Sequence, residues 1–335
     1  MVQHCRIHEQ EKAMHLSDRQ ITLRFMAAPT DVATLGGGVR GGRILEWVDK
    51  AAYACAAAWS GGYSVTAYVG NISFGRDIDS GDIVEVTATL ILTGRSSMHI
   101  ECRVASADPR LGEFTEASRC ILVFVAVDDD GTPTPVRQWR PVLPDDLDRA
   151  AYAAERTEVR NRITAAMAGA DYGAPSTAPE ASTRFLAAPT DVNWGGNTHG
   201  GRVMGWIDDA AYLCGVRWCG GEAVTVYMGG VRFYEPIRIG QVVEVSARLI
   251  HTGRQTMHVS VHVHAHWPRD GRQTRRLAAH GLTVLAALDA DGDAAPAPTW
   301  TPRLPGDVAL DRHARELIAI RGQRRPAREH RMVEI

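Results

Sequence analysis

The sequence predicts an α+β protein made of two tandem copies of one domain, each an antiparallel sheet wrapped around a single central helix. Three repeated segments indicate the duplication. RFMAAPTDV at 24–32 returns as RFLAAPTDV at 184–192, and TGRSSMH at 93–99 returns as TGRQTMH at 252–258. GGRILEWVDKAAYACAAAW at 41–59 returns as GGRVMGWIDDAAYLCGVRW at 200–218. Since the matches keep their order at an offset of 159–160 residues, a whole domain has been duplicated.

Each copy is expected to contain the same elements in the same order. A short extended segment, at about 20–28 and 181–188, leads through a Gly-rich turn into the helix. In the first helix Ile44, Val48 and Cys55 recur at helical spacing and form an apolar stripe that can pack on a sheet. Four β-rich runs separated by Gly-containing turns follow, as in antiparallel strands. These runs are 63–74, 82–93, 97–106 and 116–127 in the first copy, and 222–233, 241–252, 256–267 and 274–288 in the second.

The segments outside the copies predict the domain limits. A charged helix running into a Pro/Gly/Ser-rich stretch separates the copies, and a further helix with a basic tail follows the second. We therefore expect a first domain at 18–136, a linker at 137–180, a second domain at 181–300 and a C-terminal helix and tail at 301–335. Two similar domains joined in this way should pair face to face, as the subunits of a homodimer do.

Composition excludes several classes of function. The 335 residues carry a formal net charge of −2, which gives no reason to expect nucleic acid or an anionic membrane as a partner. No apolar run approaches the roughly 18–20 residues of a membrane span, and the N-terminus lacks the apolar core of a signal peptide. The six cysteines show no CxxC or zinc spacing, so we expect reduced, buried thiols. These features favour a soluble, cytoplasmic protein.

The two copies differ in their polar residues around the helix. Both keep an acid at the same helical position, Asp49 and Asp208. The second copy also carries an amide and an imidazole ahead of its helix that the first copy lacks. Asn193 and His199 stand where the first copy has Ala33 or Thr34 and Arg40. One copy has therefore lost polar groups that the other retains.

These residues, in this order, resemble a known family. The pattern N…HGG…(M/I)D entering a helix, then VTxY, then TGR(x)(S/T)M, is similar to the hotdog-fold acyl-CoA thioesterases, and most closely to their tandem, double-hotdog members. The resemblance covers roughly 20–130 and 180–290. It implies two tandem hotdog domains, acyl-CoA as the partner and substrate, no cofactor beyond the coenzyme A of the substrate, and a homo-oligomer, commonly a trimer of such chains.

The resemblance also implies where the active site lies. In such thioesterases an Asn from the loop before one helix works with an acid on the helix of the partner domain. Asn193 lies 15 residues before Asp208, which matches the family spacing. The composite site would then use Asn193 of the second domain with Asp49 of the first. The reciprocal site keeps Asp208 but has Arg40-Gly41-Gly42 in place of HGG, so we interpret it as degenerate.

Thioester hydrolysis needs an activated water and stabilisation of the developing oxyanion. Asp49 is the candidate general base or nucleophile, and Asn193 could hold the water or donate to the carbonyl. The backbone N–H groups of His199, Gly200 and Gly201 start a helix and could face the carbonyl oxygen. Other interpretations stay open: a solvated helix acid at position 49, an Asx-turn or capping role for position 193, and a loop-orienting role for the histidine.

Other motifs carry weaker functional predictions. Arg95 and Arg254 of the TGR turns could bind the nucleotide of coenzyme A, although hairpin charges explain them equally well. HVSVHVHAH at 258–266 places four histidines on one strand face, which we expect to be solvated, as the matching face with His99, Glu101 and Arg103 should be; we expect no metal. GGGVRG at 36–41 fits a dinucleotide turn, but its copy GGNTHG breaks the pattern.

Two other functions compete with hydrolysis. A domain pair that binds acyl-CoA without turnover would act as a sensor. An enoyl-CoA hydratase would need an Asp/His pair, and no histidine lies near Asp49 in the sequence.

Overall fold

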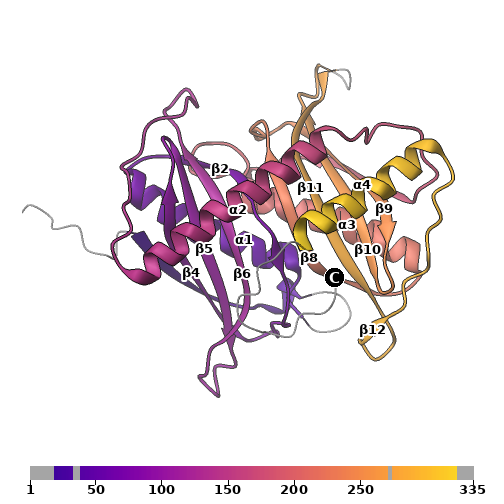
Figure 1. Ribbon diagram of the computed structural model, residues 1–335, viewed down its shortest axis with the longest axis horizontal. Helices are drawn as coiled ribbons and strands as arrows, with labels where there is room; N and C mark the ends of the chain where they lie inside the picture. The colour runs from indigo at the N-terminus through magenta and orange to yellow at the C-terminus, as the bar shows by residue number, and fades with distance from the viewer. Residues whose placement is uncertain (1–18, 33–37, 271–273, 323–335) are drawn as a thin grey trace, which may run out of the picture.

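The computed structural model describes residues 19–32, 38–270 and 274–322, and shows two similar halves joined by one sheet (Figure 1). The first half contains β1 (Gln20–Met26), α1 (Gly41–Ser60), β2 (Ser64–Val69), β3 (Ile72–Ser73), β4 (Ile83–Thr93), β5 (Ser97–Ala107) and β6 (Thr115–Ala126). The second contains β7 (Glu180–Leu186), α3 (Gly200–Cys219), β8 (Ala223–Phe233), β9 (Val242–Thr252), β10 (Thr256–His266), β11 (Arg276–Leu288) and β12 (Ala294–Ala295). The helix α2 (Pro144–Ala168) joins the halves, and α4 (Pro305–Gly322) follows the second. The predicted tandem α+β architecture is confirmed.

Over the described residues the strands form one 12-stranded sheet in the order β1-β4-β5-β6-β2-β8-β11-β10-β9-β7. The halves join where β2 pairs with β8, with Tyr68 opposite Arg232. The run predicted at 63–74 is interrupted at Gly70, whose N–H donates to the Ile121 carbonyl at 2.8 Å. Beyond this break β3 pairs with β8 of the other half, through Ile72 and Met228. This extra pairing strengthens the junction between the domains.

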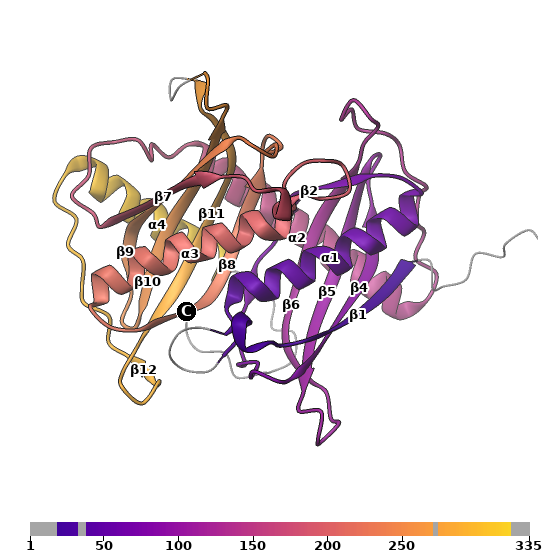
Figure 2. The same ribbon diagram turned by 180° about the vertical axis from the view of Figure 1, so that it is seen from behind.

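The helices α1 and α3 lie on the same side of the sheet and meet where the halves join (Figure 2). The predicted apolar stripe of α1 is buried: Val48 and Cys55 are fully covered, and burial raises the pKa of the Cys55 thiol to about 12. The helices approach so closely that a Cβ on Gly42 would lie 2.9 Å from the Gly205 Cα. Glycine is required at this crossing because backbone atoms could not make room for a side chain.

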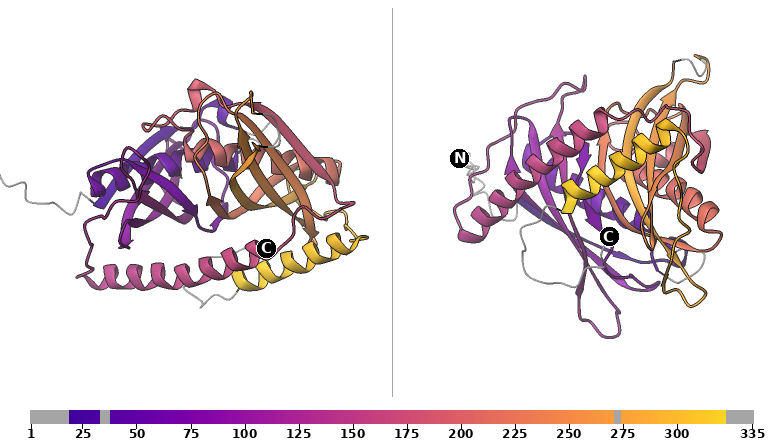
Figure 3. Two further views of the ribbon diagram at one scale, coloured as in Figure 1. Left: turned by 90° about the horizontal axis from the view of Figure 1, so that it is seen from above. Right: turned by 45° about the vertical axis from the view of Figure 1, so that its right-hand side comes forward.

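The opposite side of the sheet is covered by α2 and α4 (Figure 3). The prediction of solvated outer faces is therefore wrong for most of the residues named. His99, Glu101 and His258 are only 6%, 4% and 2% exposed, whereas Arg103 is exposed as expected. Over the first half, Arg149 of α2 lies 3.8 Å from Glu101. Over the second half the cover is apolar and comes from the predicted linker and tail: Val159, Ile163, Met167, Leu310, Leu317 and Ile320.

His258 and His262 on this face are neutral at physiological pH. Burial lowers the pKa of His262 to about 4 and that of His258 well below its usual value. His262 stacks on His280 with ring centroids 3.9 Å apart. Among the residues that the structure describes, no group of three or more His, Cys, Asp or Glu is placed to hold a metal ion. In the same part of the chain, no helix is both long and apolar enough to cross a membrane.

Candidate active site

Each central helix begins beside an acid of the other central helix. His199 and Gly201, at the N-terminal end of α3, face Asp49 of α1. In the same way Gly42, at the N-terminal end of α1, faces Asp208 of α3. We call these two places the Asp49 site and the Asp208 site. Both lie at the interface between the domains, because each combines a helix start from one domain with an acid from the other.

At the Asp49 site the carboxylate is 2% exposed and held on both oxygens. Thr66 of β2 donates its hydroxyl to Asp49 Oδ1 at 2.7 Å, and the Gly201 N–H donates to Oδ2 at 2.8 Å. The Nδ1 atom of His199 lies 2.8 Å from the same Oδ2. The same Nδ1 atom accepts a hydrogen bond from the Gly201 N–H at 3.1 Å. The site thus pairs an acid of one domain with an imidazole of the other.

The three predicted oxyanion donors are used differently. The His199 N–H donates to the Asp191 carbonyl at 2.8 Å, and the Gly201 N–H is taken by Asp49. Unlike the other two, the Gly200 N–H has no acceptor among the residues that the structure describes. A Cβ on Gly200 would lie 2.8 Å from Thr66 Oγ1 and 3.1 Å from Asp49 Oδ2. Glycine at this position keeps the space beside the acid open.

Asn193 serves its own loop in this structure. Its side-chain Oδ1 accepts hydrogen bonds from the backbone N–H groups of Gly195 and Asn197, at 2.9 and 3.0 Å. This is the Asx-turn geometry that the sequence left open, and it orders the segment 193–199, here called the Asn193 loop. The next residue, Trp194, stacks on Tyr53 of α1 with centroids 4.5 Å apart. The loop is therefore fastened to the helix that carries Asp49.

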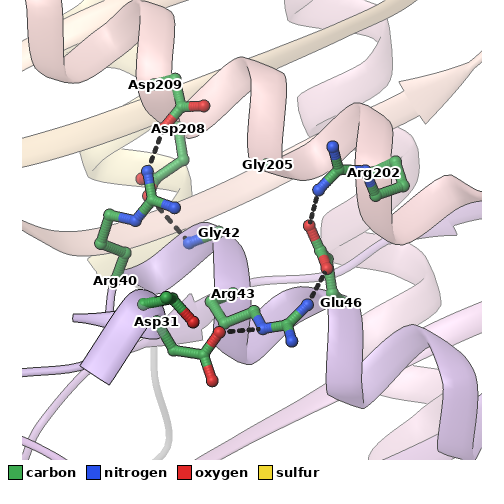
Figure 4. A pocket seen from close by; sticks show the side chains of 10 residues that line it. Asp31, Arg40, Gly42, Arg43, Glu46, Arg202, Gly205, Asp208 and Asp209 are labelled. Carbon is green, nitrogen blue, oxygen red and sulfur yellow. Dashed lines mark hydrogen bonds and ion pairs between the residues drawn. The ribbon is translucent and has the colours of Figure 1, made fainter. Parts of the chain in front are cut away.

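The Asp208 site keeps the acid and its cradle but not the imidazole. Asp208 Oδ2 accepts from the Gly42 N–H at 2.8 Å, and Oδ1 accepts from Thr225 at 2.6 Å. Burial raises the pKa of the Asp208 carboxyl, while these hydrogen bonds oppose the rise. Arg40, the counterpart of His199, makes its side-chain hydrogen bond to Asp209, at 3.0 Å (Figure 4). The positions of Ala33 and Thr34 lie outside the described residues.

A polar cavity of about 220 Å³ borders the Asp208 site and not the Asp49 site. Figure 4 shows its lining, which includes Arg40, Arg43, Glu46 and Arg202. Each of its three arginines is already paired with an acid. The cavity therefore does not by itself identify a reacting centre. The geometry around the two acids is the better guide to chemistry.

Sequence reasoning missed two threonines and one pair. Thr66 and Thr225 belong to the repeated VTxY motif, so their retention 17 residues after each acid was an available signal. The Asp49–His199 pair could not be seen as a neighbouring motif, because 150 residues separate its members. Arg95 and Arg254 are exposed on hairpins, and their backbone carbonyls accept from Val136 and Ala297 N–H groups. Their contact with coenzyme A stays a prediction.

Two α+β domains whose central helices meet across one sheet define a class, the tandem hotdog proteins. Two segments of this chain, 36–113 and 195–269, match the thioesterase superfamily. The cytosolic acyl coenzyme A thioester hydrolase of Homo sapiens is 25% identical over 300 residues, covering 84% of this chain and 78% of the human protein. An uncharacterised acyl-CoA thioester hydrolase of Zymomonas mobilis is 32% identical over 115 residues, covering 34% of this chain and 75% of that protein. The chain belongs to the thioesterase superfamily, among its tandem hotdog acyl-CoA thioesterases.

A solved structure supports the fold over most of the chain. The putative oleoyl thioesterase of Lactobacillus plantarum covers 82% of this chain and 99% of its own, with a TM-score of 0.56 and 10% identity. At that identity the likeness shows the hotdog fold and nothing about the substrate.

Proposed function

We propose that this protein hydrolyses acyl-CoA thioesters to a free acid and coenzyme A at a single composite site, the Asp49 site. The observation that carries the proposal is the meeting of Asp49 with His199 Nδ1 and the Gly201 N–H, each at 2.8 Å, across the domain interface. The names of the human and Zymomonas mobilis relatives agree with this reaction.

The groups at the site suit the two demands of the reaction. Asp49 is the base that takes a proton from water, and the His199 imidazole of the other domain borders its carboxylate, with Nδ1 2.8 Å from Oδ2. The Gly200 N–H is positioned to donate to the thioester oxygen, and losing one such donor typically costs on the order of 10²–10³ in rate. The Oδ1 atom of Asn193 is held by the loop, which leaves its NH₂ group to donate to the carbonyl or the water.

The Asp208 site is proposed to be inactive. Asp208 has the same threonine and backbone donors as Asp49, but Arg40 stands in place of the imidazole and makes its side-chain hydrogen bond to Asp209. The Asp208 site therefore lacks the imidazole that meets the acid at the Asp49 site. The duplication therefore leaves one working site per chain.

Enoyl-CoA hydration is a second candidate, and one observation favours keeping it. The sequence argued against it because no histidine lies near Asp49 along the chain. Folding supplies that histidine, since His199 reaches Asp49 from the other domain. An acid–imidazole pair can deliver water to a carbon–carbon double bond as well as to a thioester.

One set of assays separates the candidates. Free coenzyme A released from a panel of saturated acyl-CoAs reports hydrolysis, and loss of the conjugated enoyl absorbance without release of coenzyme A reports hydration. We expect release of coenzyme A by the parent and almost none by Asp49→Asn. Enoyl-CoA consumption alone would establish the hydratase, and tight acyl-CoA binding without either reaction would establish the sensor.

Location and assembly are also proposals. The word cytosolic in the human relative's name supports the expected cytoplasmic location. A trimer of these chains is the expected assembly, and its molar mass in solution, three times the 36.5 kDa chain, would test it. Variants of Arg95 and Arg254 to alanine should raise KM if these side chains bind the nucleotide of coenzyme A.

A further inference from the structure

A network of ion pairs built on three buried acids lies between the two central helices, apart from the side chains of Asp49 and Asn193. Glu46 of α1 is 5% exposed and binds two arginines, one from each domain. Its Oε2 accepts from Arg43 Nη1 at 2.5 Å, and its Oε1 accepts from Arg202 Nη1 at 2.8 Å (Figure 4). Each arginine also binds a buried aspartate of the repeated APTDV motif: Arg43 binds Asp31 at 2.8 Å and Arg202 binds Asp191 at 2.9 Å.

The two aspartates hold the segments that enter the helices. Asp191 Oδ2 accepts from the Ala188 N–H at 3.0 Å, and the Asp191 carbonyl accepts from the His199 N–H at 2.8 Å. Asp191 thus fixes the base of the Asn193 loop at both ends. Asp31 does the same in the first domain, where its Oδ2 and its carbonyl accept from Ala28 and Arg40 N–H groups. The local anchors of the two loops match contact for contact.

The connection to the opposite helix does not match. On the Asp49 side, Arg202 runs from Asp191 across the interface to Glu46, one helical turn before Asp49. On the other side, Arg43 reaches only Glu46 of its own helix, because the counterpart of Glu46 on α3 is Gly205. A Cβ on Gly205 would lie 3.3 Å from Glu46 Oε1, so a second carboxylate there would face the first. In this chain only the α1 position carries an acid.

We propose that Asp191, acting through Arg202 and Glu46, is a positioning residue that sets the Asn193 loop against Asp49. The contacts close a ring from Asp49 along α1 to Glu46, across to Arg202, on to Asp191 and through His199 back to Asp49. The corresponding ring at the Asp208 site is open at Gly205. The inference rests on the proposed function, because it concerns the geometry of that same site.

The test compares Asp191→Asn with Asp31→Asn, two buried aspartates with equivalent local contacts. A purely structural role predicts equal effects, whereas positioning predicts different effects on catalysis. We expect similar drops in melting temperature, a kcat at least tenfold lower for D191N with KM changed less than threefold, and a normal kcat for D31N. Equal losses of kcat in the two variants, or a normal kcat in D191N, would overturn the proposal.

A second readout does not depend on turnover. The imidazole NMR signals of His199, assigned with His199→Gln, should shift in D191N and stay in place in D31N without substrate. If the parent hydrolyses no thioester, the proposed function fails. The NMR comparison of D191N with D31N still decides whether Asp191 positions the histidine. Unchanged signals in D191N would refute the positioning. If D191N does not fold, Arg202→Lys against Arg43→Lys makes the same comparison with the same expected difference.

Discussion

Replacing Thr66 with valine should separate the two acid sites by function while affecting their stability alike. The substitution keeps a β-branched side chain in β2 but removes the hydroxyl that donates to Asp49 Oδ1 at 2.7 Å. A hydrogen bond to a charged group contributes about 1.5–3 kcal/mol, and Asp49 is 2% exposed, so water cannot easily replace the lost donor. The matched change, Thr225→Val, removes the 2.6 Å hydrogen bond to Asp208.

We expect both variants to melt several degrees below the parent in a thermal scan. If the lost energy also loosens the carboxylate in the transition state, kcat of T66V should fall roughly 10- to 150-fold, since each 1.4 kcal/mol is a factor of ten. The assay is release of free coenzyme A at saturating acyl-CoA, with T225V expected within about twofold of the parent. Equal losses of kcat in both variants, or an unchanged kcat in T66V, would refute the reasoning.

Three further predictions follow from the same contacts. Because burial lowers the pKa of His262 to about 4 and an unfolded histidine titrates near 6.5, the unfolded chain binds more protons between these values. The free energy of unfolding should therefore fall as the pH drops from about 6.5 toward 4, by on the order of 2 kcal/mol at pH 5 from this residue. Melting curves recorded across this pH range should show the fall, and His262→Phe should show a shallower one. A melting temperature that does not change with pH would contradict the prediction. Gly201→Ala places a Cβ 2.7 Å from the Glu46 Cα, and Gly42→Ala places one 2.9 Å from the Gly205 Cα. Each substitution should lower the free energy of unfolding by about 1–3 kcal/mol, but only G201A should abolish turnover. Loss of turnover in both variants would count against a single site. Trp194→Ala removes an aromatic stack worth about 0.5–1.5 kcal/mol and should lower kcat/KM about 2- to 10-fold by loosening the Asn193 loop. An unchanged kcat/KM would show that the stack does not contribute to catalysis.

The fold could be predicted from the sequence because duplication repeats every signal. Two copies of one pattern of helix and strands gave the tandem architecture, and the small residues of α1, such as Cys55, gave the buried face. The cover on the outer face could not be predicted in the same way. The apolar residues by which α2 and α4 cover the second half of the sheet are scattered among charges, so in the sequence they resemble a solvated linker and tail.

The candidate site was predicted in part. Asp49 and Asp208 were indicated by their survival in both copies, and the structure places each against the helix start of the other domain. The role of His199 as a partner of Asp49 could not be seen, because their contact depends on how the two domains dock. The turn formed by Asn193 and the bridging position of Glu46 likewise depend on three-dimensional contacts that no local pattern records.

The central claim is that one chain holds one working site, made by both domains around Asp49. The most direct test measures release of coenzyme A by Asp49→Asn and Asp208→Asn at saturating acyl-CoA, beside the parent. Both acids are buried and hold equivalent threonine and backbone donors, so the two variants carry matched structural costs. The account predicts almost no turnover in D49N and near-parent turnover in D208N, whereas equal losses in both, or the reverse order, would contradict it.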